Sequence, residues 1–428
     1  MRNICFLILF IACSGMLHAQ QPVPSMQYTF GNAKTRPGYT VVAADVQYSD
    51  QSGFGFDLGT SPTKTTGSAD AFYFSVKVPE GNYLVTLEIG NKSTASLTTV
   101  KAESRRLMLE DIKVKAGELV TKTFIVNIKD RNISADRQVS LKPRELTKLD
   151  WDDKLTLEFD GKSAVQSVKI TRVNKPVTVY LAGNSTVVNQ DDEPWASWGQ
   201  MIPRFFQPGV AIANHAESGL TLGSFIGSRR LEKVLSVIRP GDYLFVEFGH
   251  NDQKDKGEND GAWKSYTQRL QLFVAEARKK GAIPVIVTST SRRSFGSAGK
   301  IENSLGDFPA AARKVAADEK VALIDLNAMS AKFYEALGEE NSKKAFVHYP
   351  ANTYPGQEKA LADNTHFNPY GAYELAKCIL QGIRDNHLGL EKFIIKGVPA
   401  FDPSHPDPVE EFHWPESPFK VIVKPDGN

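Results

Sequence analysis

Four short polar segments of this chain carry the residue types that acyl transfer through a serine nucleophile requires. Their sequences are Gly183-Asn184-Ser185-Thr186, Asn214-His215-Ala216-Glu217-Ser218-Gly219, Gly249-His250-Asn251-Asp252 and Asp363-Asn364-Thr365-His366. A serine hydroxyl is a poor nucleophile at its own pKa, so Ser185 needs a base within hydrogen-bond reach. We predict that His366 is this base and that Asp363, three residues earlier, holds its imidazole in the required tautomer.

The tetrahedral intermediate of this reaction needs hydrogen-bond donors directed at its oxyanion. We predict three donors: the backbone N–H of Ser185, the backbone N–H of Gly219 and the side-chain amide of Asn251. Losing one such donor lowers the rate by a factor on the order of 10²–10³. Gly219 suits the role because a residue without a side chain lets the backbone approach a ligand closely.

Ser185 alone has a second interpretation. It directly follows an apolar run, and a Ser after a strand commonly caps the next helix or belongs to a turn. The other three segments favour the nucleophile, because in an open α/β sheet the ligand site collects side chains from several carboxyl ends of strands.

The elements that must position these segments form a doubly wound parallel α/β sheet. After residue 174 short apolar runs alternate with amphipathic helical segments, the sequence form of such a sheet. The predicted strands are 177–182, 210–214, 243–248, 283–288 and 321–325. The predicted helices include 195–206 and 266–279, which repeat apolar residues at helical spacing.

The first part of the chain has a different pattern. Apolar residues alternate in short segments such as 72–78, 83–89 and 120–128, separated by Gly, Asn, Asp and Pro. This predicts an antiparallel β-sandwich over residues 21–174, with a galactose-binding-like fold as one option. The Gly-rich stretch 53–59 is predicted to be a loop that carries aromatic residues, which fill a core or stack on sugar rings.

Residues 1–20 have the layout of a secretory signal peptide, with Arg2 before a short apolar core. That core is too short to span a bilayer. Cleavage near Ala19 would give an exported protein, periplasmic or secreted in a bacterium, whereas a lipid anchor at Cys13 is the alternative. Cleavage leaves Cys378 as the one cysteine, so no disulfide is expected within the mature chain.

The composition limits the partners. The chain has 428 residues, a length that predicts two domains, and a formal net charge of +2. No basic run points to nucleic acid. His405 and His413, in a Pro-rich tail over 397–428 that is predicted to be extended, lack the neighbouring ligands of a metal site. The sequence does not set the oligomeric state.

The four polar segments, in this order, resemble the consensus blocks of the SGNH (GDSL-type) hydrolases. The resemblance covers residues 177–386 and implies a flavodoxin-like hydrolase domain over 175–396. In it Ser185 corresponds to the nucleophile, and Gly219 and Asn251 correspond to the oxyanion donors. Asp363 and His366 correspond to the D-x-x-H block that completes the triad.

Within that superfamily the chain is most similar to rhamnogalacturonan acetylesterases. The similarity rests on Gly-x-Ser-Thr-Val, on Trp195-x-x-Trp198-Gly199 and on Asp363-x-Thr365-His366-Phe367. It implies removal of acetyl groups from pectic rhamnogalacturonan, a plant cell-wall polysaccharide, without a metal or organic cofactor. One position departs from the family, which usually has Asp before the nucleophile where this chain has Asn184.

Arg292 and Arg293 follow the fourth predicted strand at the same rim of the sheet. A guanidinium group matches a carboxylate bidentately, so both are candidates to bind a galacturonate carboxylate. Their alternative role is as solvated loop charges.

Two further functions remain open at this point. One is ester hydrolysis on xylan, another glycan or a lipid, although no long apolar surface helix favours a lipid. The other is carbohydrate binding by the sandwich, with an inactive hydrolase domain.

Overall fold

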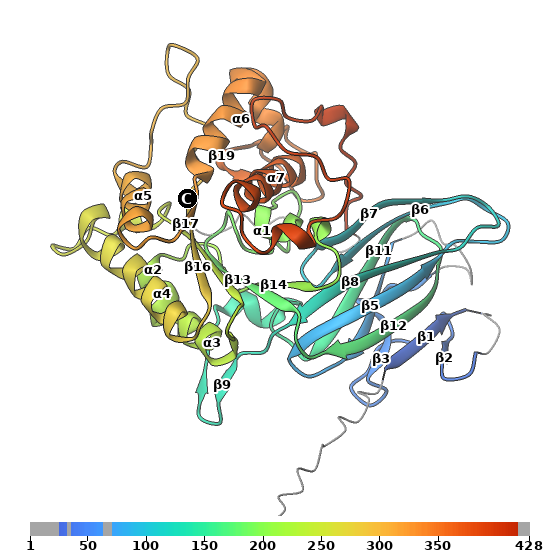
Figure 1. The fold of residues 1–428 in the computed structure, drawn as a ribbon. Helices are drawn as coiled ribbons and strands as arrows, with labels where there is room; N and C mark the ends of the chain where they lie inside the picture. The colour runs from blue at the N-terminus through green and yellow to red at the C-terminus, as the bar shows by residue number, and fades with distance from the viewer. Residues whose placement is uncertain (1–24, 32–35, 63–70, 418–428) are drawn as a thin grey trace, which may run out of the picture.

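The computed structural model describes residues 25–31, 36–62 and 71–417, so the predicted leader with Cys5 and Cys13 lies outside the described residues. Residues 25–174, here called the two-sheet half, contain two five-stranded sheets (Figure 1). Their strand orders are β2-β1-β12-β5-β8 and β3-β4-β11-β6-β7. Neighbouring strands are antiparallel except β1 and β2.

The strands of the first sheet are β1 (Met26–Phe30), β2 (Thr40–Val42), β5 (Gly81–Ile89), β8 (Val120–Ile128) and β12 (Val165–Val173). Those of the second are β3 (Phe54–Asp57), β4 (Phe72–Lys77), β6 (Ser96–Ala102), β7 (Arg106–Val114) and β11 (Lys154–Lys162). Both sheets bury alternate residues in one apolar core, as β5 does with Tyr83, Val85, Leu87 and Ile89.

The loop predicted for residues 53–59 was wrong over Phe54–Asp57, which form β3 at the edge of the second sheet. The Phe56 side chain is fully buried and its ring lies against those of Phe30, Phe72 and Phe74. The prediction failed because the strand is only four residues long and glycines lie on both sides of it. Phe56 therefore fills the core.

A short hairpin of β9 (Asn132–Ser134) and β10 (Arg137–Gln138) follows β8 in the chain.

The second part of the chain, residues 175–396, here called the parallel-sheet half, contains a five-stranded parallel sheet of order β14-β13-β15-β16-β17. The strands are β13 (Val177–Gly183), β14 (Val210–Asn214), β15 (Tyr243–Phe248), β16 (Ile283–Thr288) and β17 (Ala322–Ile324). The prediction of these five strands is confirmed, with end shifts of one residue at β13 and β17.

Helices cover both faces of this sheet. The helices are α1 (Trp198–Met201), α2 (Leu222–Gly227), α3 (Arg230–Val237), α4 (Thr267–Lys279), α5 (Phe308–Asp318), α6 (Leu326–Asn341) and α7 (Pro369–Asp385). Along β13, Val179 and Leu181 join the core under α1, α6 and α7, whereas Tyr180 and Ala182 join the core under α2 to α5. The sheet is therefore buried on both faces, as parallel sheets require.

The helix predicted over 195–206 is shorter than expected. It begins at Trp198, where Ser197 accepts the N–H of Gln200, and continues after Met201 as the 3₁₀ turn Ile202–Phe205. Pro203 lies in that turn and lacks the N–H that a continuing α-helix needs. The apolar side chains of Trp198, Ile202 and Phe205 are buried as the pattern predicted.

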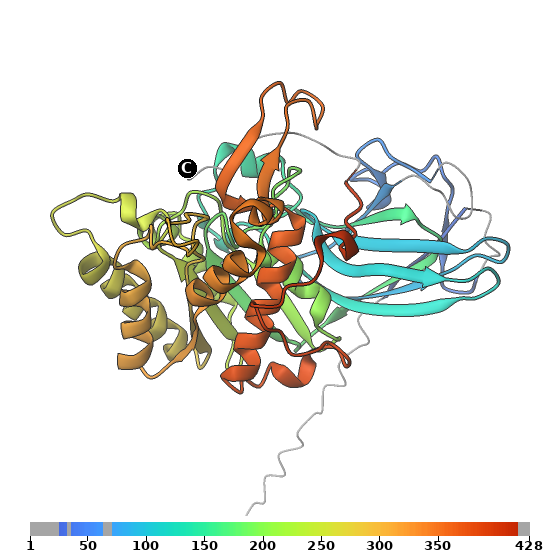
Figure 2. The ribbon, with the colours of Figure 1, turned by 90° about the horizontal axis from the view of Figure 1, so that it is seen from above.

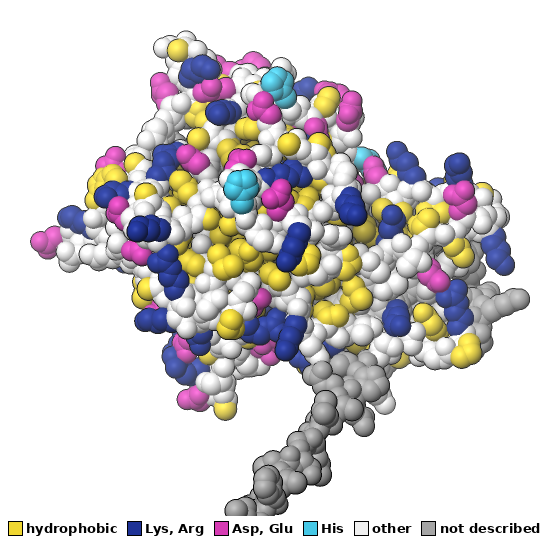
Figure 3. Space-filling model, viewed as in Figure 1, with side chains coloured by type: hydrophobic (Ala, Val, Ile, Leu, Met, Phe, Trp, Pro, Cys, Tyr) yellow, Lys and Arg dark blue, Asp and Glu magenta, His cyan; other side chains and the backbone are white. Residues whose placement is uncertain are grey.

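Two late segments complete the fold. The antiparallel hairpin of β18 (Phe346–Tyr349) and β19 (Leu361–Phe367) projects from the body of the molecule (Figure 2). The tail, described to residue 417, runs back to the two-sheet half, where Lys101 Nζ donates to Pro415 O at 2.7 Å. Basic and acidic side chains are interspersed over the face shown in Figure 3.

Candidate active site

Ser185 lies two residues after the end of β13, the strand between β14 and β15 in the sheet. The chain leaves β13 toward β14 and later returns to β15 on the other side, so the carboxyl end of β13 is the topological switch point where open α/β sheets place their ligand sites. Gly183 precedes the turn, and a Cβ there would meet Val187 Cγ2 at 2.5 Å. The local packing therefore fixes the sharp exit that carries Ser185.

Hydrogen bonds of Asn184, Thr186 and Glu247 support the turn that carries Ser185. Asn184 Oδ1 accepts the N–H of Thr186 at 3.2 Å and its hydroxyl at 3.0 Å. These bonds require an acceptor oxygen, which Asn provides as Asp would. Thr186 Oγ1 also lies 2.9 Å from Glu247 Oε1, while Trp198 Nε1 donates to Glu247 Oε2 at 2.5 Å. Burial raises the pKa of Glu247 to about 7.

His366 and Asp363 reach the turn from the projecting hairpin. In the β18–β19 pairing Phe346 faces Phe367 but Val347 faces Asp363, so the residues between them bulge out of the ladder. His366 Nε2 lies 2.8 Å from Ser185 Oγ, and His366 Nδ1 lies 2.8 Å from Asp363 Oδ2. The structure thus brings together the three side chains that the sequence proposed as a triad.

The environment of Asp363 favours its ionised form. Burial opposes ionisation, but the hydrogen bond and charge of His366 and the N–H groups of His366 and Thr365 hold the pKa of Asp363 well below its ordinary value. Its Oδ1 accepts those two N–H groups at 3.0 and 2.8 Å. A carboxylate held in this way can stabilise an imidazolium at the other oxygen.

The proposed oxyanion donors come from the next two strand ends. Gly219 has φ +78°, a left-handed conformation that favours glycine. Asn251 Nδ2 gives one hydrogen to Leu220 O at 3.2 Å, and Asn251 Oδ1 accepts from Lys254 Nζ at 3.2 Å. The amide carries two hydrogens, so this orientation leaves one N–H for a ligand.

Arg292 and Arg293, both predicted to bind a carboxylate, have different environments in the structure. Arg293 is 8% exposed, and its guanidinium donates to Ser342 Oγ at 2.9 Å, to Asn364 Oδ1 at 3.1 Å and to Glu339 O. Its guanidinium is thus engaged in internal packing. Arg292 is more exposed, and its hydrogen bonds within the described residues are long, at 3.3 Å to Ser304 O and 3.4 Å to His250 O. Arg292 therefore borders the site.

His250 is a second histidine at this rim, and its environment disfavours a charge. Burial, followed by the positive charge of Arg292, lowers the pKa of His250 to about 3. Its ring is buried, and a backbone contact with Thr290, which favours the charged form, does not offset the burial. His250 is therefore a neutral packing residue, which leaves His366 as the imidazole in contact with the serine.

Sequence reasoning missed two supporting residues. Gln190 Nε2 donates to the carbonyl oxygen of Ser185 at 2.7 Å, and Glu247 lies under the turn as described above. The acidic residue inside the apolar strand β15 was a signal for Glu247, since a buried carboxyl normally has a specific partner. Gln190 had no such signal, because nothing in the sequence relates it to the turn.

The described residues contain no group of three or more His, Cys, Asp or Glu side chains that could hold a metal ion. His405 Nδ1 instead lies 2.9 Å from Asp402 Oδ2, and His413 Nδ1 lies 2.8 Å from Asp111 Oδ1. In the same described part of the chain, no helix is both long and apolar enough to cross a membrane.

Comparisons with known proteins show which proteins this chain is similar to. The model of the GDSL-like Lipase/Acylhydrolase family matches residues 181–372. The rhamnogalacturonan acetylesterase RhgT of Bacillus subtilis (strain 168) is 41% identical over 225 residues, 52% of this chain and 96% of that protein. The probable rhamnogalacturonan acetylesterase YesY of the same organism is 35% identical over 221 residues, 51% of this chain and 97% of that protein. Among solved structures, YxiM of Bacillus subtilis is 24% identical with a TM-score of 0.48, covering 85% of this chain and 99% of its own.

Proposed function

Because this chain belongs to the GDSL-like lipase and acylhydrolase family, and is therefore a carboxylic ester hydrolase, we propose that it removes acetyl groups from acetylated pectic rhamnogalacturonan. The observation that carries the proposal is the 2.8 Å contact between His366 Nε2 and Ser185 Oγ. The substrate is proposed from the two rhamnogalacturonan acetylesterases above, to which about half of this chain is similar over almost their whole length.

In the proposed reaction Ser185 Oγ attacks the acetyl carbonyl carbon while His366 Nε2 takes the hydroxyl proton. The oxyanion that forms accepts hydrogen bonds from the N–H groups of Ser185 and Gly219 and from Asn251 Nδ2. The sugar oxygen then leaves with the proton from His366. A water molecule, deprotonated by His366, hydrolyses the acetyl-enzyme to acetate and free serine. Asp363 stabilises the imidazolium in both steps.

Arg292 has the role of holding a galacturonate carboxylate beside the triad. Its partial exposure and long internal contacts support this role, because a guanidinium that is not saturated by internal acceptors can form a bidentate pair with a substrate carboxylate. Arg293 has no part in the proposed binding.

The direct test is acetate release by the purified protein from a panel of acetylated polysaccharides. Acetate from rhamnogalacturonan supports the proposal, whereas release from acetylated xylan but not from rhamnogalacturonan would refute the substrate and keep the reaction. Hydrolysis of no acetylated polysaccharide, together with retained binding to pectin, would favour a carbohydrate-binding protein.

We also propose that the chain is exported and that residues 21–174 are a β-sandwich domain in their own right. The signal-like segment before residue 21 supports export, and the apolar core shared by the two sheets supports the domain. Amino-terminal sequencing of the protein from its native host tests the first point. Cooperative unfolding of the isolated fragment 21–174 tests the second, and a fragment without a folding transition would contradict it.

A further inference from the structure

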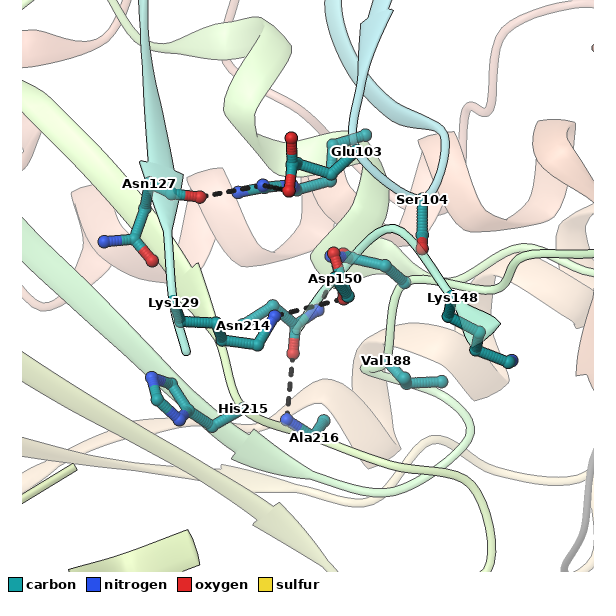
Figure 4. A network of polar contacts seen from close by, with 12 residues as sticks. Glu103, Ser104, Asn127, Lys129, Lys148, Asp150, Val188, Asn214, His215 and Ala216 are labelled. Atoms are coloured by element: carbon teal, nitrogen blue, oxygen red, sulfur yellow. Dashed lines mark hydrogen bonds and ion pairs between the residues drawn. The ribbon is translucent and has the colours of Figure 1, made fainter. Parts of the chain in front are cut away.

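A cavity of about 280 Å³ lies between the two-sheet half and the parallel-sheet half. Leu58, Thr147 and Lys148 line it from the two-sheet half, and Val188, Asp192 and Ser218 line it from the parallel-sheet half. Figure 4 shows Lys148 and Val188 beside each other where the two halves meet. This volume is just below the range of about 300–1,000 Å³ that is typical of small-ligand sites.

Two residues of the cavity wall adjoin residues of the candidate active site. Gln190 lines the cavity, and its Nε2 donates to the carbonyl oxygen of Ser185 at 2.7 Å. Ser218 lines it as well and directly precedes Gly219, the proposed oxyanion donor. A polymer whose acetyl ester lies at Ser185 therefore has this cavity as a neighbouring place for its next residues.

Hydrogen bonds across the junction hold the two halves in fixed positions. Asp150, in the two-sheet half, accepts Asn189 Nδ2 at 2.9 Å and pairs with Lys129 Nζ at 3.2 Å. Asn189 Oδ1 in turn accepts Asn214 Nδ2 at 3.0 Å, and Asn214 Oδ1 accepts the N–H of Ala216 at 3.1 Å. The cavity is thus built into the fold, since the same bonds fix the segments that follow β13 and β14.

The chemistry of the lining suits a saccharide. Leu58, Leu149 and Val188 offer apolar surface, and Asp192 offers a carboxylate that accepts no hydrogen bond from the described residues. Burial, followed by the charge of Asp191, raises the pKa of Asp192 to about 6, so the group is an acceptor for hydroxyls at neutral pH. Sugar rings combine apolar faces with hydroxyl edges, and this lining matches both.

The cations of the cavity are already paired. Arg144 contacts Glu217 and Lys148 contacts Asp191, each within the cavity wall, and the third lining cation, Arg105, pairs with Glu193. These pairs leave little uncompensated positive charge for an anionic ligand. The lining therefore selects for hydroxyl groups rather than for a carboxylate.

We propose that this cavity is a subsite for a sugar residue next to the acetylated one, so that the two-sheet half contributes directly to recognition of the polysaccharide. The inference rests on the proposed function, because it requires a polymeric acetylated substrate. It assigns to Thr147, Asp192 and their neighbours a role that a small acetyl ester does not use.

The test compares Thr147→Trp, which places a large ring in the cavity, with Leu146→Trp. Thr147 and Leu146 are consecutive and exposed in one 3₁₀ turn, but Leu146, 60% exposed, does not line the cavity. The measurement is the ratio of kcat/KM for acetylated rhamnogalacturonan to kcat/KM for 4-nitrophenyl acetate. We expect Thr147→Trp to lower this ratio at least tenfold through KM, and Asp192→Asn to lower it several-fold. Leu146→Trp should leave the ratio as in the wild type.

An unchanged ratio in both Thr147→Trp and Asp192→Asn would overturn the subsite. If the wild type releases acetate from acetylated xylan but not from rhamnogalacturonan, the proposed substrate fails, and the same ratio measured on xylan decides the subsite. If the wild type hydrolyses 4-nitrophenyl acetate but no acetylated polysaccharide, both the proposed function and the subsite are wrong.

Discussion

His366 Nε2 lies 2.8 Å from Ser185 Oγ although the two residues are 181 positions apart in the chain. The contact joins the exit of β13, the strand between β14 and β15, to the bulged strand β19 of a projecting hairpin. Neither segment could form this contact alone. The turn that carries Ser185 is supported by Glu247, and His366 is positioned by the bulge in β19. The functional geometry is therefore a property of the whole parallel-sheet half.

The orienting role of Asp363 gives the first prediction. Asp363→Asn removes the negative charge that stabilises the imidazolium and allows the wrong tautomer of His366. We expect kcat for acetate release to fall by a factor on the order of 10⁴ with little change in KM. Asp385→Asn, at the exposed end of α7, is the matched control and should keep full activity. A kcat within tenfold of the wild type would remove Asp363 from the proposed triad.

The second prediction concerns the side-chain oxyanion donor. Asn251→Ala removes one of three donors, so kcat should fall by a factor on the order of 10²–10³ while KM stays close to the wild-type value. Asn303→Ala changes an exposed amide outside the site and serves as the control. Steady-state kinetics with 4-nitrophenyl acetate measure both variants. A rise in KM at unchanged kcat would mean that Asn251 binds the ground state instead.

The third prediction separates the two neighbouring arginines. Arg293→Ala leaves buried acceptors such as Ser342 Oγ without a donor, so it should lower the free energy of unfolding by about 2–4 kcal/mol. Arg292→Ala should leave stability unchanged and raise KM for a polymer with uronate carboxylates about tenfold. Urea unfolding and kinetics on rhamnogalacturonan measure the two effects. The same KM for Arg292→Ala as for wild type would exclude the carboxylate contact.

The fourth prediction follows from the buried carboxyl of Glu247, whose pKa rises from 4.5 to about 7 through burial. Below pH 4.5 the group is protonated in both states. Between pH 4.5 and about 7 only the unfolded chain releases the proton, so the free energy of unfolding falls as pH rises. The total loss from this group is about 3 kcal/mol.

Glu247→Gln tests this prediction, since a Gln amide can accept from Trp198 Nε1 and donate to Thr186 Oγ1 as the protonated acid does. The difference in unfolding free energy between variant and wild type should grow in favour of the variant by about 3 kcal/mol from pH 4 to pH 8. Glu258→Gln, an exposed control, should follow the wild type. Parallel curves for Glu247→Gln and wild type would show that Glu247 is ionised in the folded protein.

Most of the parallel sheet could be predicted from the sequence because its strands are buried on both faces and appear as short apolar runs. β14, β15 and β16 have the predicted bounds. Shorter elements were less predictable. β3 is a four-residue edge strand between glycines, and the first helix ends early at a proline, so local context outweighed the apolar pattern in both places.

The side chains of the candidate site were predictable because nucleophile, base and acid need particular residue types in an order that a strand-end site makes possible. The residues that hold these side chains in position could not be predicted. Asp150 bonds to Asn189 across the junction of the two halves, and Gln190 bonds to the serine carbonyl, through contacts set only by tertiary packing. Arg292 and Arg293 are identical in type and adjacent, so only the fold distinguishes their environments.

The central claim is that Ser185 is the nucleophile of an acetylesterase, and the most direct measurement is acetate release from acetylated rhamnogalacturonan by wild type and by Ser185→Ala. Circular dichroism and the unfolding midpoint of both proteins check whether the fold is kept. We expect release by the wild type and a loss in kcat on the order of 10⁶ in the variant, as for other serine triads. Release by Ser185→Ala at the wild-type rate would contradict the claim.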